Sequence, residues 1–104
     1  MKNLFENIPK DLPEELIDEI ISGDNFRFKR IVSSGHSSPE GFWYDQSENE
    51  LVILISGSAG IEFIDNNVID LKPGNYLIIP AHLKHRITYT SLSRETVWLA
   101  LFYK

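Results

Sequence analysis

Five consecutive aliphatic residues at positions 51–55 constrain the fold of this chain more than any other stretch. The run is rich in β-branched residues, is too short for an independent helix and stops close to Gly57, so it predicts a β-strand that is buried on both faces. Glu50 stands at the entrance to this strand. Because side chains alternate along a strand, the Glu50 carboxyl points to the same side as Val52 and Leu54, into the core. A buried carboxylate is costly without a partner, so another part of the chain must supply one.

Short segments of strand character recur along most of the chain, with turn signals about every 8–12 residues, as in β-sandwiches and β-barrels. The pair Asn66-Asn67 tolerates positive φ and predicts a hairpin, and Lys72–Asn75 predicts a second tight turn. We expect strands at residues 26–32, 42–46, 51–55, 61–65, 68–71, 76–79, 85–90 and 96–103. Without any βαβ alternation, this spacing predicts an all-β fold whose two sheets close into a barrel and leave few exposed edges.

One α-helix is expected ahead of the strands, from Pro13 to Ile21. Proline suits the first helical position, and the acidic residues that follow it favour the N-terminal half of the helix dipole. The apolar residues of the segment form one stripe, and Gly23 is suited to a C-terminal stop. We interpret the acidic residues as a solvated face. The sequence therefore predicts an arm and helix over residues 1–24 and a barrel over residues 25–104.

Composition excludes several classes of function. A chain of 104 residues allows one domain with one core. Its net charge of -5 and its lack of a basic cluster argue against binding to nucleic acid or to anionic membranes. It has no cysteine, which excludes disulfides, thiolate metal ligands and cysteine nucleophiles. No apolar run approaches the roughly 20 residues that span a bilayer, and the N-terminal residues lack the apolar stretch of a signal peptide. The expected location is the cytoplasm.

The histidines are the first candidates as partners of Glu50. His82 and His85 are three residues apart, beside a turn that Pro80 begins, and this spacing can bring both imidazoles to one pocket. Together with Gln46, four residues before Glu50, they offer nitrogen and oxygen donors for a metal ion. Histidines beside a proline turn are also common as ordinary loop residues, so the spacing alone leaves both interpretations open.

Two motifs resemble those of the cupin superfamily, in particular its small single-domain members with a type-2 conserved barrel. The first cupin motif ends in E-x6-G, which Glu50 and Gly57 match. The second contains G-x5-P followed by a histidine, which Gly74, Pro80 and His85 match. The resemblance covers the expected barrel. It implies a double-stranded β-helix, or jelly-roll barrel, here with one N-terminal helix.

The resemblance also implies a metal site, because cupins usually bind a metal ion through two histidines and the glutamate of the first motif and one histidine of the second. Glu50 and His85 are the ligands that carry over position by position. The first-motif histidine positions carry no histidine here, and depending on the spacing they fall on Tyr44 and Gln46 or on Trp43 and Asp45. In the second motif, the glycine position is His82 and the final asparagine position is Tyr89.

Two interpretations of this site follow. In the first, the barrel holds a divalent metal ion; an oxygen-rich shell favours Mn²⁺ or Fe²⁺, with Zn²⁺ and Ni²⁺ as alternatives. In the second, the barrel has lost its metal, and Glu50 is hydrogen-bonded to His85 or Tyr44 in a buried polar network. The candidate ligands are Gln46, Asp45, Glu50, His85 and His82. We expect Tyr44, Tyr89 and Trp98 to line the pocket, Tyr89 because it shares a strand face with His85.

Three functional hypotheses remain open at this stage. The protein is a metal-dependent enzyme acting on a small polar substrate, a non-catalytic barrel that binds or senses a small molecule, or an interaction module. Serine-type nucleophilic catalysis has no support, because the chain lacks a G-x-S-x-G elbow. A homodimer is expected, because residues 26–32 and the N-terminal arm offer edge backbone and apolar area that a second chain can cover.

Overall fold

The computed structural model covers residues 1–104, which form eight β-strands joined by turns and loops. The strands expected at 68–71, 76–79, 85–90 and 96–103 are present with these bounds. The structure contains no helix that could cross a membrane. The strands are β1 (Leu16–Gly23), β2 (Phe26–Ser33), β3 (Asn49–Ser56), β4 (Ala59–Phe63), β5 (Val68–Leu71), β6 (Tyr76–Ile79), β7 (His85–Thr90) and β8 (Thr96–Tyr103).

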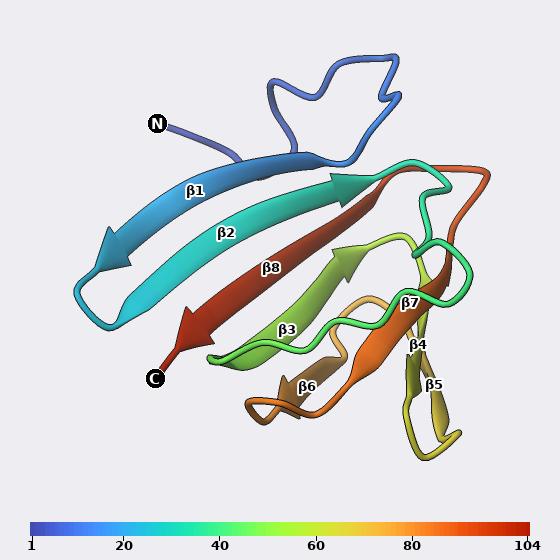
Figure 1. Cartoon of the computed structure of the whole chain (residues 1–104). Helices are drawn as coiled ribbons and strands as arrows, with labels where there is room; N and C mark the ends of the chain where they lie inside the picture. The colour runs from blue at the N-terminus through green and yellow to red at the C-terminus, as the bar shows by residue number, and fades with distance from the viewer.

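The strands are arranged in two antiparallel sheets. The larger sheet has the order β1-β2-β8-β3-β6, and the smaller one has the order β5-β4-β7. Figure 1 shows the five strands of the larger sheet side by side, with the smaller sheet at one end of the layer. The last strand in sequence, β8, is therefore the central strand of the larger sheet. The all-β, double-sheet barrel predicted from the sequence is confirmed.

The core lies between the two sheets and is apolar. On β3, Glu50, Val52 and Leu54 are buried and point inward, whereas Leu51 and Ile53 are half-buried and point outward. The inward direction of Glu50 is as predicted, but the expectation that β3 is fully buried on both faces is wrong. The central cluster consists of Val52, Leu54, Ala59, Ile61, Phe63, Leu71, Ile79 and Trp98.

The helix predicted from Pro13 to Ile21 is wrong, because this segment contains β1. The strand pairs antiparallel with β2, and its register shifts between Glu19 and Ile21. A bulge of this kind adds one residue to the strand and breaks the two-residue alternation, so successive isoleucines imitate the spacing of a helical stripe. Isoleucine is also β-branched, which lowers its preference for helix. Gly23 lies in the hairpin to β2 and does not end a helix.

β2 is an interior strand of the larger sheet, with β1 on one side and β8 on the other. It therefore offers no free edge, and the expectation that residues 26–32 provide edge backbone for a second chain is wrong. The division predicted after residue 24 falls within the β1–β2 hairpin, so β1 forms one sheet with the strands that follow it.

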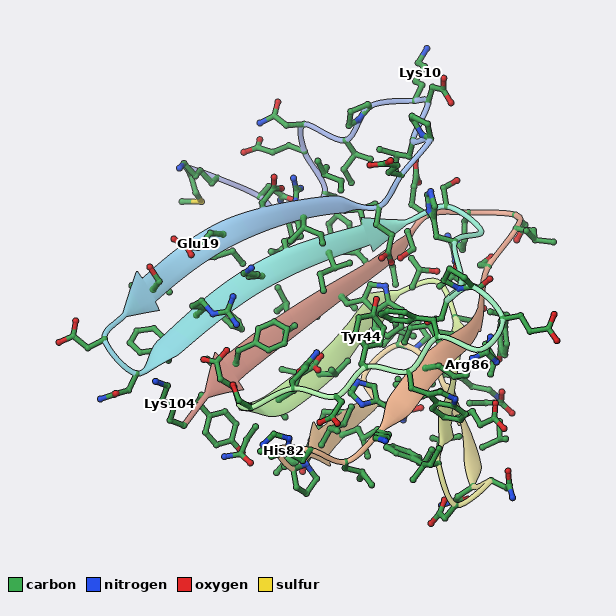
Figure 2. The ribbon with its side chains drawn as sticks, in the orientation of Figure 1. Lys10, Glu19, Tyr44, His82, Arg86 and Lys104 are labelled. Atoms are coloured by element: carbon green, nitrogen blue, oxygen red, sulfur yellow. The ribbon has the colours of Figure 1, made fainter.

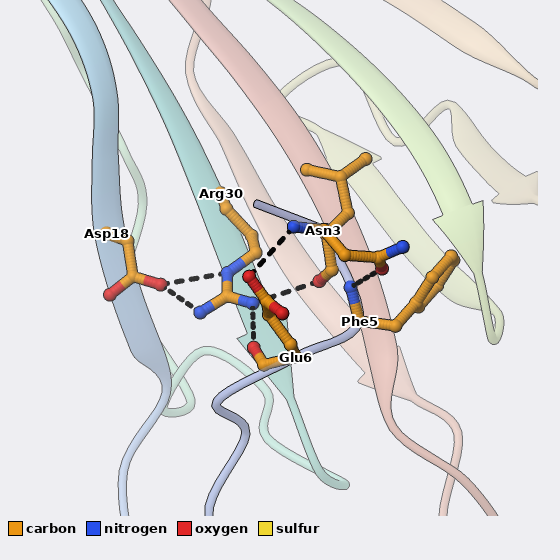
Figure 3. A network of polar contacts seen from close by, with 6 residues as sticks. Asn3, Phe5, Glu6, Asp18 and Arg30 are labelled. Carbon is orange, nitrogen blue, oxygen red and sulfur yellow. Dashed lines mark hydrogen bonds and ion pairs between the residues drawn. The ribbon is translucent and has the colours of Figure 1, made fainter. Parts of the chain in front are cut away.

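The N-terminal arm is held against the larger sheet by Arg30. This residue is 8% exposed, and its guanidinium donates to the carbonyls of Leu4 (2.9 Å) and Glu6 (2.8 Å) and to the carboxylate of Asp18 on β1. Figure 3 shows these contacts, with the arm crossing beside the guanidinium. One buried cation thus fixes both the arm and the edge strand, and its charge is neutralised where it is buried.

Two turns contain a residue with a positive φ angle, which restricts the residue types that fit there. Asn66 has a φ of 71° and lies in the β4–β5 hairpin, which confirms the turn predicted at Asn66-Asn67. Gly57 follows β3 with a φ of 86°, and a Cβ atom at this residue would lie 2.6 Å from the Cα atom of Thr96. Because that distance is a clash with backbone, only glycine fits between β3 and the start of β8.

Candidate functional site

One cavity of about 140 Å³ lies inside the barrel. It has room for several water molecules or for a ligand of a few heavy atoms, and it is smaller than the roughly 300–1,000 Å³ of pockets for drug-sized ligands. Most of its wall is apolar, so the few polar groups determine what it can bind. The apolar lining residues are Ile17, Ile31, Val52, Ile61, Ile79, Ile87, Trp98, Ala100 and Phe102, and the polar ones are Glu15, Tyr44, Gln46, Glu50 and His85.

Glu50 is the buried acid of the cavity. It is 7% exposed, and its Oε1 atom has no hydrogen-bond partner. Burial raises the pKa of the Glu50 carboxyl to about 7, and a hydrogen bond from the Gln46 side chain opposes this rise. Near neutral pH, this carboxyl can therefore hold or release a proton, which an exposed carboxyl cannot do.

His85 begins β7 and faces Glu50 across the cavity. Its Nδ1 atom is 2.9 Å from the backbone carbonyl of Leu83, and since a carbonyl only accepts, Nδ1–H is the donor. Burial lowers the pKa of the imidazole, although the hydrogen bond to Leu83 opposes the shift. The neutral ring therefore presents a bare Nε2 lone pair, 3.7 Å from the Glu50 Oε1 atom. When Glu50 is ionised, two electron-pair donors therefore face each other across the cavity.

Tyr44 and Gln46 reach the cavity from the loop before β3. Tyr44 exchanges backbone hydrogen bonds of 2.7 and 3.1 Å with His85, and the two rings stack at 5.4 Å between centroids. Burial, followed by the charges of Glu15 and Glu50, raises the pKa of the Tyr44 hydroxyl. Residues 42–46 were expected to form a strand, but Tyr44 makes only an isolated bridge. Together with the hydrogen bond of 2.8 Å from the His82 backbone N–H to the Gln46 carbonyl, that bridge holds the loop, and the Gln46 side chain donates to Glu50.

The cavity adjoins an outer pocket of about 230 Å³ beside the N-terminal segment, and the two share Glu15, Tyr44 and Ile87. The Glu15 carboxylate accepts a hydrogen bond from the Ser33 hydroxyl, which in turn accepts one from the Trp98 indole at 3.2 Å. This chain of hydrogen bonds fixes the acid at the boundary between the two spaces. Sequence reasoning missed Glu15, because the segment that carries it was assigned to a helix.

Asp45 and His82 lie outside the cavity. Their side chains are exposed, and they pair with each other, with 2.8 Å between His82 Nδ1 and Asp45 Oδ1. Figure 2 shows His82 at the turn before β7, away from Tyr44. The φ angle of His82 is 65°, which is unfavourable for a residue other than glycine. The structure thus brings Gln46, Glu50 and His85 together and does not bring Asp45 or His82 to them.

Of the three aromatic residues expected to line the pocket, Tyr44 and Trp98 do so and Tyr89 does not. Tyr89 is 40% exposed, and its hydroxyl donates to Asp70 at 2.8 Å on the outside of the smaller sheet. This hydrogen bond is the main reason that the pKa of Tyr89 is raised. The prediction that Tyr89 shares a strand face with His85 assumed regular alternation. This alternation is interrupted, because the register of β7 against β4 shifts between Gly60 and Ile61.

The donors in the cavity are compatible with a metal ion, although they are few. No group of three or more histidine, cysteine, aspartate or glutamate side chains converges anywhere in the structure. Glu50 and His85 are two such ligands, and the Gln46 amide is the nearest further donor. Two atoms each about 2.1 Å from one tetrahedral ion lie about 3.4 Å apart. The separation of 3.7 Å between Glu50 Oε1 and His85 Nε2 is close to that value.

Comparisons with known proteins agree with the fold. The family model for the cupin domain matches residues 29–102. No curated protein sequence matches the chain significantly. Among solved structures, a Ralstonia eutropha protein described as a candidate mannose-6-phosphate isomerase is 39% identical, with a TM-score of 0.96, over 100% of this chain and 97% of its own.

Two more distant structures share the fold alone. A cupin superfamily protein from Desulfitobacterium hafniense is 23% identical, with a TM-score of 0.76, over 92% of this chain and 83% of its own. A conserved Streptococcus pyogenes protein of unknown function is 14% identical, with a TM-score of 0.77, over 100% of this chain and 86% of its own.

Proposed function

This chain belongs to the cupin domain family, and we propose that its barrel binds one divalent metal ion together with a small polar ligand. The proposed protein ligands are Glu50, His85 and Gln46. One observation carries the proposal: the Glu50 Oε1 atom is buried without a partner, and the bare His85 Nε2 atom lies 3.7 Å away. Two facing lone pairs repel each other, and a cation between them removes the repulsion.

The donor set limits the choice of metal and of ligand. One imidazole nitrogen with carboxylate and amide oxygens suits Mn²⁺ or Fe²⁺, and Zn²⁺ and Ni²⁺ also accept these donors. A metal ion in this position supplies a Lewis acid that polarises an oxygen of the bound molecule. The volume of about 140 Å³ restricts that molecule to a few heavy atoms in the inner cavity. Tyr44 lines both the inner cavity and the outer pocket, and we propose that its hydroxyl orients the ligand.

Metal uptake tests this proposal directly. The protein is purified without chelator or nickel resin, titrated with Mn²⁺, Fe²⁺, Zn²⁺ or Ni²⁺, and analysed for metal by elemental analysis. We expect about one equivalent for the wild type and less than a tenth for Glu50→Gln and for His85→Ala. His82→Ala is the matched control, because His82 lies outside the cavity, and it should bind as the wild type does. Failure of the wild type to take up any of these metals would refute the metal site.

A second candidate is a metal-free barrel that binds its ligand through hydrogen bonds. It is favoured by the presence of only two strong donors and by the pKa of about 7 of Glu50. A protonated Glu50 donates a hydrogen bond, while His85 Nε2 accepts one, so the pair suits a small ligand with both a donor and an acceptor. This candidate predicts small-molecule binding that weakens as pH rises above 7 and is unchanged by chelators, whereas binding through a metal is abolished by chelators.

Catalysis by the metal-free barrel would rest on the same carboxyl, because a bound metal ion would keep Glu50 ionised. A group with a pKa near 7 can accept and return a proton at neutral pH, which is what the isomerisation of a sugar requires. The description of the Ralstonia eutropha relative makes mannose 6-phosphate the first substrate to test, although the whole molecule is larger than the inner cavity and would also have to occupy the outer pocket. Incubation in D₂O, followed by NMR, would show conversion and deuterium incorporation by the wild type and neither by Glu50→Gln. No conversion by the metal-free wild type would exclude this substrate and leave metal binding to be judged by uptake alone.

A further inference from the structure

The inner cavity and the outer pocket adjoin each other at three residues that line both of them, Glu15, Tyr44 and Ile87. The two volumes, about 140 Å³ and about 230 Å³, together reach the lower end of the roughly 300–1,000 Å³ range of ligand pockets. A molecule that is too large for the inner cavity can therefore extend outward past Glu15. The chemistry of the outer pocket then determines which group it carries there.

The charged side chains that line these two spaces are all acidic. Glu14 and Glu15 contribute two carboxylates to the outer pocket, and no lysine or arginine lines either space. His36 adds no cation to the outer pocket, because its Nδ1 atom accepts a hydrogen bond of 2.9 Å from the backbone N–H of Ser34 and so carries no proton. With Glu50 farther in, three carboxyl groups line the connected spaces.

Glu15 is held in position and has one oxygen left to bind a ligand. Its Oε2 atom accepts the hydrogen bond from the Ser33 hydroxyl, and Ser33 is itself fully buried and bonded to the Trp98 indole. Its Oε1 atom accepts no hydrogen bond from the protein. A carboxylate that the protein already holds in place loses little side-chain entropy when it binds a ligand.

A second, independent observation indicates that the space takes up a polar ligand. The Glu50 side chain is only 9% exposed, it lines the cavity, and its Oε1 atom has no hydrogen-bond partner. A buried carboxyl oxygen without a partner is costly, and a polar group that enters the cavity removes that cost. A ligand that reaches inward to Glu50 places its outer part beside Glu15, because Glu15 lines both spaces.

We propose that the ligand of this site carries a protonated amine, which the Glu15 carboxylate binds while Glu14 adds a second negative charge to the outer pocket. This inference rests on the proposed function, since it assigns a chemical class to the ligand of the same cavity. A protonated amine donates hydrogen bonds and carries the charge opposite to both carboxylates. A phosphate or carboxylate group in the outer pocket would meet two like charges and no cation, which disfavours mannose 6-phosphate as the ligand.

Three compounds of similar size and different charge test the proposal: aminopropanediol, which is cationic at neutral pH, glycerol, which is neutral, and glycerate, which is anionic. Each is titrated into the protein at neutral pH in the presence of chelator, and binding is followed by NMR. Aminopropanediol should bind about tenfold or more tightly than glycerol, because a hydrogen bond to a charged group contributes about ten- to a hundredfold in affinity. Glycerate should bind most weakly of the three.

Substitutions that remove one charge locate the amine. Glu15→Gln keeps the size of the side chain and an oxygen that can accept from Ser33, so it should lower the affinity for aminopropanediol about tenfold and leave that for glycerol unchanged. Glu14→Gln should have a smaller effect in the same direction, and because Glu14 is exposed, this variant keeps the fold. Asp24→Asn is the matched control, since it removes the same charge at the opposite end of β1 and should bind all three compounds as the wild type does.

Each outcome decides the proposal. No binding of aminopropanediol, equal affinity for aminopropanediol and glycerate, or an unchanged preference in both Glu14→Gln and Glu15→Gln would overturn it. Glu15 is not one of the proposed metal ligands, so Glu15→Gln should take up metal as the wild type does. A protein that binds metal without preferring the amine refutes this inference alone, and a protein that prefers the amine but takes up no metal refutes the metal site alone.

Discussion

Replacing Glu50 with glutamine should change the pH dependence of stability more than any other single substitution. The pKa of Glu50 is raised from 4.5 to about 7 in the folded protein. Below pH 4.5 the carboxyl is protonated in both the folded and unfolded states. Between these two values the folded state keeps its proton while the unfolded state loses it, so the free energy of unfolding falls as pH rises. At about 1.36 kcal/mol for each pKa unit, the loss by pH 8 is about 3 kcal/mol.

The Glu50→Gln variant lacks this titration, so its stability relative to the wild type should increase from pH 4.5 to pH 8 by up to about 3 kcal/mol. His85 also affects stability: because its pKa is lowered, it destabilises the fold as pH falls through its ordinary range, but it does so in both proteins. Urea unfolding followed by tryptophan fluorescence, in the presence of chelator, gives the difference at each pH. Glu40→Gln, a change at an exposed loop residue, controls for the altered net charge.

A constant difference between the wild type and Glu50→Gln across this pH range would refute the reasoning, as would a variant that is the less stable protein at pH 8. Metal provides an internal check. Because a bound cation favours the ionised carboxylate, saturating metal should stabilise the wild type at pH 8 and leave Glu50→Gln unchanged.

Three further substitutions test features outside the cavity. His82→Gly should leave metal uptake unchanged and raise the free energy of unfolding by up to about 1 kcal/mol, because glycine removes the strain of the positive φ. A clear loss of stability in urea unfolding would show that the ion pair with Asp45 outweighs the strain. Arg30→Ala should cost about 2–4 kcal/mol and expose residues 1–10 to limited proteolysis, since it removes the buried cation that holds the arm; an arm as protected as in the wild type would contradict this role. Gly57→Ala should destabilise the protein by several kcal/mol more than Gly74→Ala. Both glycines have a positive φ, but only a Cβ atom at Gly57 would clash with backbone. Equal losses of stability in thermal unfolding would show that the backbone adjusts.

The sequence was most informative where strands are regular. β5, β6, β7 and β8 have the predicted bounds, because each is a short β-rich run between clear turn residues. β1 was missed, because its bulge between Glu19 and Ile21 gives isoleucines a helical spacing. The segment forms a strand because it pairs with β2 along its whole length. This is a long-range interaction, and local periodicity gives no information about it.

The site was predictable to the extent that it depends on alternation and on motif position. Glu50 and His85 were assigned to the interior, and the structure places them there. Spacing suggested that His82 could join them, but the cupin motif has glycine at this position, and the positive φ of His82 shows why. Motif position was therefore a better guide than chemical type. The orientation of Tyr89 was missed because a register shift reverses the strand face after Gly60.

The central position of β8 also has a consequence during protein synthesis. β8 pairs with β2 on one side and β3 on the other, yet it is the last of the eight strands to leave the ribosome. Until it emerges, the β1–β2 hairpin and the β3–β6 pair have no strand to join them, and their apolar side chains stay in contact with water. The smaller sheet lacks this dependence, because β4, β5 and β7 all precede β8. Nascent chains should therefore be most prone to aggregation just before β8 is complete.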